Sequence, residues 1–172
     1  GGSLVRPPAV WLNSAQGAGN GLEISGTVAR TGGQVVMRMT LSNKTGGPMS
    51  GFAFQFNKNS FSLMGTVGVP DIPAGGSQQV EMPLTNTGQR DRTDPLNKVD
   101  IAVKNNLGIM YFAVLIPFNT LLAEDGRLER EPYLQKWPAM GDANEQKTII
   151  NGAKSSSECK AILEANNIFV VA

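Results

Sequence analysis

The sequence predicts a mainly β chain, in which an immunoglobulin-like antiparallel β-sandwich is followed by the first part of an α+β unit. Three observations support this prediction. Short segments alternate apolar and polar residues, which places every second side chain on one face of a strand. Clusters of Gly, Pro, Asn and Ser separate these segments at intervals of about ten residues. Charged residues become dense after Pro117, where one clear helix signal also appears.

Five segments alternate clearly, and each has one apolar side that we expect to face the core. The inward residues are Leu22, Ile24 and Val28 in 22–29; Val35, Met37, Met39 and Leu41 in 35–41; Val80, Met82 and Leu84 in 78–84; Val99, Ile101 and Val103 in 98–104; and Met110, Phe112, Val114 and Ile116 in 109–116. Turn signals lie between these segments, including the Gly- and Pro-rich stretch 43–49 and the pair Asn105-Asn106. This pattern is typical of a two-sheet sandwich.

Two further strands are less regular. Phe52, Phe54 and Phe56 alternate, so their rings should share one face of a strand over 52–56. Residues 61–69 are apolar but contain two glycines, which predicts a bent or short strand. With these two, the number of strands reaches the seven or so that the sandwich requires.

The part after residue 126 has mixed α and β character. A capping box, Ser155 with Glu158, predicts a helix over 156–165 whose apolar face carries Cys159, Ile162 and Leu163. Short strands are expected at 147–150 and 168–171. We therefore divide the chain into the end of a linker (1–9), a sandwich (10–126) and a partial second subdomain (127–172).

Composition excludes several classes of function. The chain has 15 basic and 14 acidic residues, and the scattered charges give no basic patch for nucleic acid. No apolar run is long enough to span a membrane, and the first residues lack the apolar core of a signal peptide. The single cysteine, Cys159, cannot form an internal disulfide, which agrees with a reducing cytosol.

Catalytic chemistry has little support in the sequence. The chain contains no histidine, which removes the common Ser-His-Asp and Cys-His triads and imidazole ligands for zinc. Two carboxylate pairs, Glu124 with Asp125 and Glu129 with Glu131, could in principle exchange protons. Because each pair lies in a charged turn, we interpret them as solvated residues, and we expect neither enzymatic activity nor a cofactor.

Four stretches resemble the C-terminal ear, or appendage, of the β subunit of clathrin adaptor complexes. They are Phe52-Ala-Phe-Gln-Phe-Asn-Lys-Asn-Ser-Phe61; Gly21-Leu-Glu-Ile-Ser-Gly-Thr27; Val103-Lys-Asn-Asn106 with Tyr111-Phe112 and Leu115-Ile-Pro117; and Glu124-Asp-Gly126 with Glu129-Arg130 before Trp137. The resemblance covers nearly the whole chain. It implies a sandwich followed by a platform subdomain, and a protein-interaction module that works in clathrin-coat assembly.

The resemblance implies two peptide-binding sites. On the side of the sandwich, Tyr111, Lys104 and Ala102 match a site for extended peptides that bear Phe or Trp. The alternation places Tyr111 on the outer face, where a half-buried strand tyrosine is the plainer interpretation. On the platform, Trp137, Arg130 and Glu145 match a groove for a helix bearing Phe, Leu and Arg. Trp137 lies in a loop-like stretch, and it could equally be a core residue of the platform.

The expected partners follow from the same resemblance. They are the clathrin heavy chain, accessory proteins with short Phe/Trp or helical Phe/Leu/Arg motifs, and other adaptor subunits through a trunk that this chain lacks. The expected location is the cytoplasmic face of clathrin-coated membranes, without insertion into the bilayer. An ear of another coat subunit, of the γ or coatomer type, is the alternative within the binding class; the others are a carboxylate-dependent sandwich hydrolase and a structural adhesion module.

The sequence departs from the family in one respect. The platform of the family continues beyond the strand that matches 168–171, whereas this sequence stops at Ala172. About 45 residues are few for an independent core. We therefore expect an incomplete platform that binds helical ligands poorly and is either loosely ordered or covered by a neighbour.

Overall fold

The computed structural model describes residues 5–144, 149, 151–152, 154–166 and 168–169. The chain divides into two compact units, one over Val5–Leu121 and the other containing Leu122–Ala172. Our predicted domain boundaries, with the sandwich ending at residue 126, stay a prediction.

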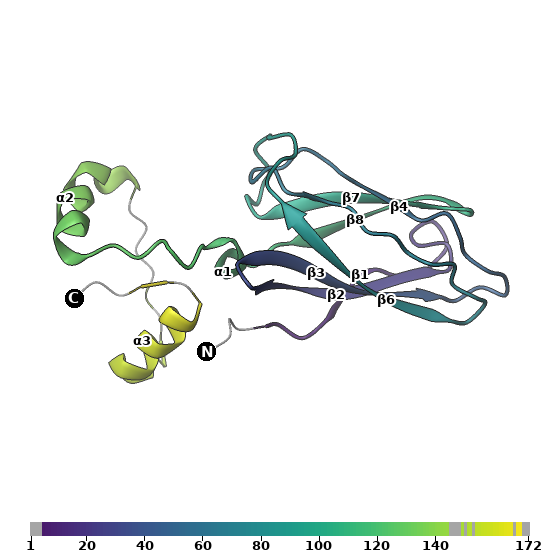
Figure 1. The fold of residues 1–172 in the computed structure, drawn as a ribbon, viewed down its shortest axis with the longest axis horizontal. Helices are drawn as coiled ribbons and strands as arrows, with labels where there is room; N and C mark the ends of the chain where they lie inside the picture. Colours follow the sequence, from purple (N-terminus) through teal and green to yellow (C-terminus); the bar gives the residue numbers. More distant parts are fainter. Residues whose placement is uncertain (1–4, 145–148, 150, 153, 167, 170–172) are drawn as a thin grey trace. The chain divides into compact units, whose positions relative to one another are not determined.

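The first unit is a β-sandwich of two antiparallel sheets, as the sequence predicts (Figure 1). One sheet has five strands in the order β1, β2, β3, β6, β5, with bounds Ala9–Leu12, Leu22–Thr31, Gln34–Asn43, Ser77–Thr85 and Met64–Gly65. The other has three strands in the order β4, β7, β8, with bounds Ala53–Phe56, Lys98–Asn105 and Gly108–Leu115. Two strands therefore border the smaller sheet, β4 on one side and β8 on the other.

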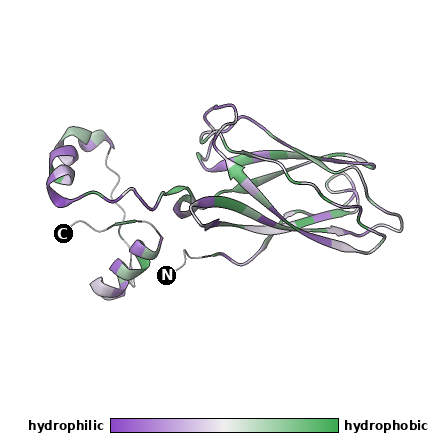
Figure 2. Cartoon of the chain, viewed as in Figure 1, coloured by the Kyte–Doolittle hydropathy of each residue, from purple (hydrophilic) through white to green (hydrophobic). Residues whose placement is uncertain are grey.

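The core lies between the sheets and is made by the inward positions that alternation predicts. All but one of the residues that we assigned inward in the five alternating segments are buried, and the exception, Val80, is half-buried against the core. The rings of Phe54 and Phe56, on one face of β4, and of Phe52 just before it also pack against this cluster. Figure 2 shows hydrophobic segments recurring along both sheets. Burial of this apolar surface is the main stabilising term of the sandwich.

Three elements of the sandwich differ from the sequence prediction. Strand β1 lies in the range that we assigned partly to a linker; its Trp11 stacks on Phe112 with ring centroids 6.5 Å apart. Only Met64–Gly65 of the expected strand 61–69 is a strand. A Cβ at Gly65 would lie 2.8 Å from atoms of Met82 and Leu84, so glycine lets this strand approach β6 closely. A short helix, α1, spans Phe118–Leu121.

A buried asparagine joins two loops at one end of the sandwich. The Asn43 side chain is fully buried, and its Nδ2 donates to the carbonyl oxygens of Gly47 (2.7 Å), Ile72 (3.1 Å) and Pro73 (3.1 Å). Its Oδ1 accepts from the N–H (2.9 Å) and the hydroxyl (2.7 Å) of Thr45. The irregular segments after β3 and before β6 are therefore held by hydrogen bonds that water cannot replace.

The second unit contains helices α2 (Arg130–Met140) and α3 (Ser156–Ala165) and a 3₁₀ turn, η1 (Asp142–Asn144). The capping box before α3 is confirmed, because Ser155 accepts from the N–H of Glu158, whose side chain accepts from the N–H of Ser155. Cys159 is half-buried, whereas Ile162 and Leu163 are exposed. Within the described residues of the whole chain, no helix is long and apolar enough to cross a bilayer.

The two strands predicted for the second unit are not found where the structure describes them. Ile149 lies in no strand, and the rest of 147–150 lies outside the described residues. Residues 168 and 169 also lie in no strand, so the strand predicted over 168–171 is wrong there, and residues 170–171 lie outside the described residues. A strand requires a hydrogen-bonded partner, and no described residue pairs with Ile168 or Phe169.

We predict that Asn43→Ala lowers the free energy of unfolding by about 2 kcal/mol or more, because buried main-chain carbonyls lose their donor. Chemical denaturation of the variant and the parent chain measures the difference. Asn86→Ala makes the same change at an exposed residue and should be nearly neutral. Equal effects of the two substitutions would contradict the role that we give to Asn43.

Candidate functional site

The outer face of the three-stranded sheet carries a row of exposed apolar side chains on β8. Ile109, Tyr111 and Leu115 are exposed, with Tyr111 at 73% the most exposed of the three. The alternate residues of β8, Met110, Phe112 and Val114, are buried in the core. This confirms that Tyr111 faces outward, and an aromatic side chain so exposed on a regular strand is available for binding.

The strand register brings the three residues of the predicted sandwich side site together. Tyr111 lies opposite Ala102 on β7, and Ala102 lies opposite Gln55 on β4. Lys104 lies opposite Ile109, which makes it the diagonal neighbour of Tyr111 on the same face. Small Ala102 leaves the phenol ring uncovered on its β7 side. Lys104 is exposed, and no residue that the structure describes forms an ion pair with it.

The main chain at Tyr111 faces the open side of β8. The N–H of Asn57 donates to the carbonyl of Asp100 (3.0 Å) at the end of the β4–β7 pairing. Because hydrogen-bonded pairs alternate in an antiparallel ladder, the main-chain groups of Ala102 point toward Gln55 on β4. Tyr111 is then in a non-hydrogen-bonded pair with Ala102, and its own N–H and C=O point away from β7. The strand offers, at one residue, an aromatic ring and main-chain groups that pair with no strand in the described part of the chain.

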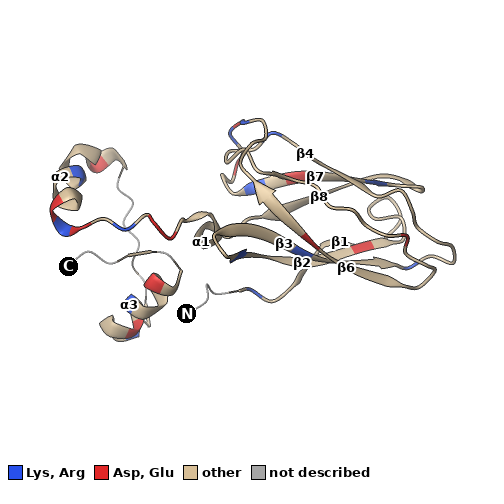
Figure 3. Ribbon diagram, viewed as in Figure 1, with Lys and Arg blue, Asp and Glu red and all other residues tan. Residues whose placement is uncertain are grey.

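This arrangement suits an extended peptide better than a compact ligand. A strand edge supplies main-chain hydrogen bonds, and the ring of Tyr111 supplies an apolar contact with a polar hydroxyl at its tip. Lys104 adds a positive charge beside that contact. Figure 3 shows that acidic and basic residues are otherwise scattered through the sandwich.

Two of the residues predicted for the platform site, Arg130 and Trp137, lie on a helix rather than in a loop. Trp137 is on α2 and is 46% exposed, so it is not a core residue of the described structure. The helix is not evident from the sequence because Pro132 and Pro138 interrupt it and its apolar residues show no helical periodicity. Pro132 lies in the first turn, where the missing N–H has no intrahelical acceptor, and Pro138 lies near the C-terminal end.

The helix places two predicted residues on one side with an aromatic that the sequence analysis missed. Arg130, Tyr133 and Trp137 are spaced at i, i+3 and i+7, which aligns them along one helical face. The rings of Tyr133 and Trp137 are tilted, with centroids 5.5 Å apart. The spacing of four between the two aromatics is the signal that could have found Tyr133. Glu145, the third residue of the predicted platform site, lies outside the described residues.

The carboxylates show no arrangement for catalysis within the described residues. Glu129 forms an exposed ion pair with Arg127 at 4.0 Å. The pKa of Glu158 is lowered because the hydroxyl and N–H of Ser155 donate to its carboxylate, and this belongs to the helix cap. No group of three or more His, Cys, Asp or Glu side chains comes together as metal ligands in the part of the chain that the structure describes.

Comparison with known proteins matches both units. Residues 11–112 match the adaptin C-terminal domain, and residues 123–172 match the C-terminal sub-domain of the beta2-adaptin appendage. AP-1 complex subunit beta-1 of Mus musculus and of Homo sapiens are each 38% identical over 175 residues, which cover 99% of this chain and 18% of those proteins. AP-1 complex subunit beta of Dictyostelium discoideum is 32% identical over 159 residues, which cover 87% of this chain and 17% of that protein. The chain therefore spans less than a fifth of the length of these relatives.

The two tryptophans should report their different environments by fluorescence. We predict that Trp137→Phe leaves the half-buried Trp11, with blue-shifted emission that acrylamide quenches slowly. Trp11→Phe should leave red-shifted, readily quenched emission from Trp137, because that ring is nearly half exposed. Emission spectra and Stern–Volmer plots make the comparison. A blue-shifted, protected Trp137 would show that this face of α2 is covered.

Proposed function

Because this chain belongs to the β-adaptin appendage family, we propose that it is a non-enzymatic interaction module that captures short peptide motifs during clathrin-coat assembly. The proposed partners are the clathrin heavy chain and accessory proteins of vesicle transport. We place it at the surface of clathrin-coated membranes, joined to other adaptor subunits by a trunk outside this sequence.

The exposure of Tyr111 is the observation that supports this function most directly. A fully formed β-sheet face holds the ring 73% exposed, with Ala102 opposite and Lys104 on the diagonal. A rigid scaffold that presents an aromatic ring in this way needs little reorganisation to bind. We assign Tyr111 as the anchor for a Phe or Trp of an extended peptide, and Lys104 as a charge that attracts acidic residues of that peptide.

Each such contact should be weak on its own. A disordered peptide loses conformational entropy when it becomes ordered on the sheet, which offsets part of the contact energy. A coat contains many copies of each component, and the linked contacts then raise the overall strength of binding. Weak individual contacts also allow partners to exchange as the coat matures.

A second ligand class belongs to the helix α2. We propose that Trp137, with Tyr133 beside it, packs against the apolar face of a helical peptide bearing Phe and Leu, and that Arg130 meets acidic residues of the same peptide. Glu145 is proposed to pair with an Arg of the ligand. Tyr133 and Trp137 support this proposal because an exposed aromatic pair on one helix face is a common binding anchor.

The alternatives have less support. The relatives named above are β subunits, which favours a β-type ear over a γ or coatomer ear. A sandwich hydrolase would need paired carboxylates in a cleft, whereas Glu129 pairs with Arg127 at the surface. A screen for turnover of glycosides and esters tests the enzyme alternative, and turnover would contradict our proposal.

We predict that Tyr111→Ala weakens capture of clathrin and accessory peptides by about 1–2 kcal/mol or more, roughly 5- to 30-fold, as for an interface anchor. A pull-down from cytosol with mass spectrometry identifies a Phe- or Trp-bearing ligand, and calorimetry with the synthetic peptide measures the change. Tyr111→Phe tests the hydroxyl separately and should retain most of the affinity.

Leu96→Ala is the matched control, because Leu96 is another exposed apolar residue of the sandwich, away from Tyr111. It should leave binding unchanged. Unchanged titration by folded Tyr111→Ala, verified by circular dichroism, would remove this site assignment.

Binding to either site should be nearly independent of pH between roughly pH 6 and 8, because the chain contains no histidine. The test is calorimetry across that range with a histidine-free peptide. A large change in affinity would contradict the prediction and would indicate a displaced pKa in a carboxyl or thiol group.

A further inference from the structure

A groove lies between β4 and β5, at the border of the three-stranded sheet opposite to β8. It has a volume of about 560 Å³, whereas two other surface grooves of the sandwich have about 300 and 280 Å³. Its walls are residues 54–58 and 63–66, and the segment 87–89 closes one end. None of the residues assigned to the Tyr111 site or to α2 lines it.

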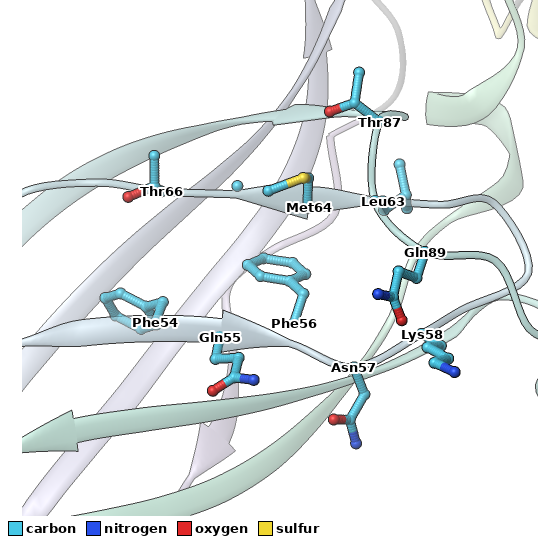
Figure 4. A pocket seen from close by; sticks show the side chains of 12 residues that line it. Phe54, Gln55, Phe56, Asn57, Lys58, Leu63, Met64, Thr66, Thr87 and Gln89 are labelled. Carbon is cyan, nitrogen blue, oxygen red and sulfur yellow. The ribbon is translucent and has the colours of Figure 1, made fainter.

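The groove has an aromatic floor. The rings of Phe54 and Phe56 rise from β4 toward the segment that carries Met64 and Thr66 (Figure 4). Both rings are half-buried, packed on the core below and open to the groove above. Met64 is 40% exposed and supplies a flexible thioether on the facing wall. Such a surface favours a planar or aliphatic side chain of a ligand.

The two walls are strand edges that belong to different sheets. Among the strands of the described residues, β4 pairs only with β7 and β5 pairs only with β6, so each has one side without a strand partner there. The hydrogen bond from the N–H of Asn57 to the carbonyl of Asp100 fixes which residues of β4 bond to β7. Because these residues alternate, the main-chain groups of Phe54 and Phe56 point away from β7. Four residues of β4 offer about 13 Å of edge to an added strand.

A buried asparagine makes the groove rigid. Asn59 is 1% exposed, and its Nδ2 donates to the carbonyls of Asn57 (3.0 Å) and Leu63 (2.8 Å). Its Oδ1 accepts from the N–H of Leu63 (2.8 Å), and its own N–H donates to the carbonyl of Gln89 (3.3 Å). The side chain and the N–H of Asn59 therefore connect the two walls and the segment 87–89 that closes the groove. A preformed groove loses little entropy when it binds a ligand.

Close packing of the segment 87–89 also indicates that the groove is rigid. The N–H of Gly88 donates to the carbonyl of Ser62 (2.8 Å). A Cβ at position 88 would lie 2.9 Å from that carbonyl oxygen and 3.3 Å from the Cβ of Met64. Glycine thus lets the segment 87–89 contact the β5 wall directly.

The charge at the rim is positive. Lys58 lines the groove and is exposed, and Arg90 follows immediately after the end wall. Neither forms an ion pair with any residue in the described part of the chain. The nearby carboxylate of Asp91 accepts from the N–H of Arg92 (2.9 Å). An acidic ligand would gain charge complementarity here, chiefly in its rate of association.

We propose that this groove is a second binding site for an extended acidic peptide, which adds as a strand to the free edge of β4 and places an aromatic side chain between Phe56 and Met64. The site is separate from the one at Tyr111. The groove combines an apolar floor, a free strand edge, preformed walls and cations at its rim. Together these features favour an extended acidic peptide over a compact neutral ligand.

The test uses the ¹⁵N-labelled chain and the blocked peptide Asp-Glu-Ile-Phe-Asp-Glu. We expect saturable chemical-shift changes centred on Phe54, Phe56, Lys58 and Met64, with the amide of Tyr111 unaffected. Replacing Phe by Ala in the peptide, or its acids by Lys, should reduce affinity by roughly fivefold or more. Shifts centred on the face of Tyr111, or no saturable shifts, would overturn the proposal.

Two variants that add negative charge, each with a matched control, locate the site independently. Met64→Glu places a carboxylate on the groove wall and should weaken binding by roughly fivefold to tenfold, whereas Leu107→Glu makes a similar change on the exposed hairpin turn and should not. Lys58→Glu should weaken binding, whereas Lys44→Glu should leave it unchanged. Tyr111→Ala should retain full affinity for this peptide. Equal changes in peptide affinity for each variant and its control would overturn the proposal. That result would not affect the Tyr111 site, which is tested separately by Tyr111→Ala with its own ligand.

Discussion

The register of the β7–β8 hairpin is the constraint on which the proposed binding face depends. Asn105 pairs with Gly108 across a two-residue turn, the Oδ1 of Asn105 accepts from the N–H of Leu107 (2.8 Å), and Gly108 takes a φ of +138° that suits glycine. Met110, Phe112 and Val114 of β8 are then in the core. A slip by one residue would exchange the places of Tyr111 and Phe112, so the energy that buries Phe112 also holds Tyr111 in solvent.

Two buried asparagines fix the conformation of loops, as the strand register fixes that of the sheets. Asn43 and Asn59 are both fully buried, and each forms several hydrogen bonds to main-chain groups of segments that are not regular strands. A loop whose peptide groups are satisfied in this way loses little freedom on binding. The sandwich therefore has stiff connections next to the surfaces where ligands are proposed to bind, although much of the chain there is irregular.

Sequence periodicity was sufficient to predict the core residues but not the contacts between segments that are distant in the sequence. Alternation located the long strands and the outward direction of Tyr111 because both depend on neighbours two residues apart. It failed for β1, whose short run of apolar residues packs through Trp11 on the distant Phe112. It failed for α2 because two prolines and the lack of periodicity concealed a helix, and Tyr133 was missed with it. The groove beside β4 could not be predicted, since its walls are brought together by Asn59 and by the glycine at position 88.

A sheet with two open borders has a consequence for solubility. Strands β4 and β8 border the same three-stranded sheet, and an unpaired border is the surface at which copies of a protein can join into a continuous sheet. The brevity of β4 opposes such joining, as do the cations Lys58, just after β4, and Lys104, on the central strand β7, because like charges would meet when copies approach. A peptide that occupies either border removes one of the two surfaces needed for growth in both directions. A ligand bound at either border would thus act as a cap that keeps neighbouring copies of the sandwich apart at high concentration.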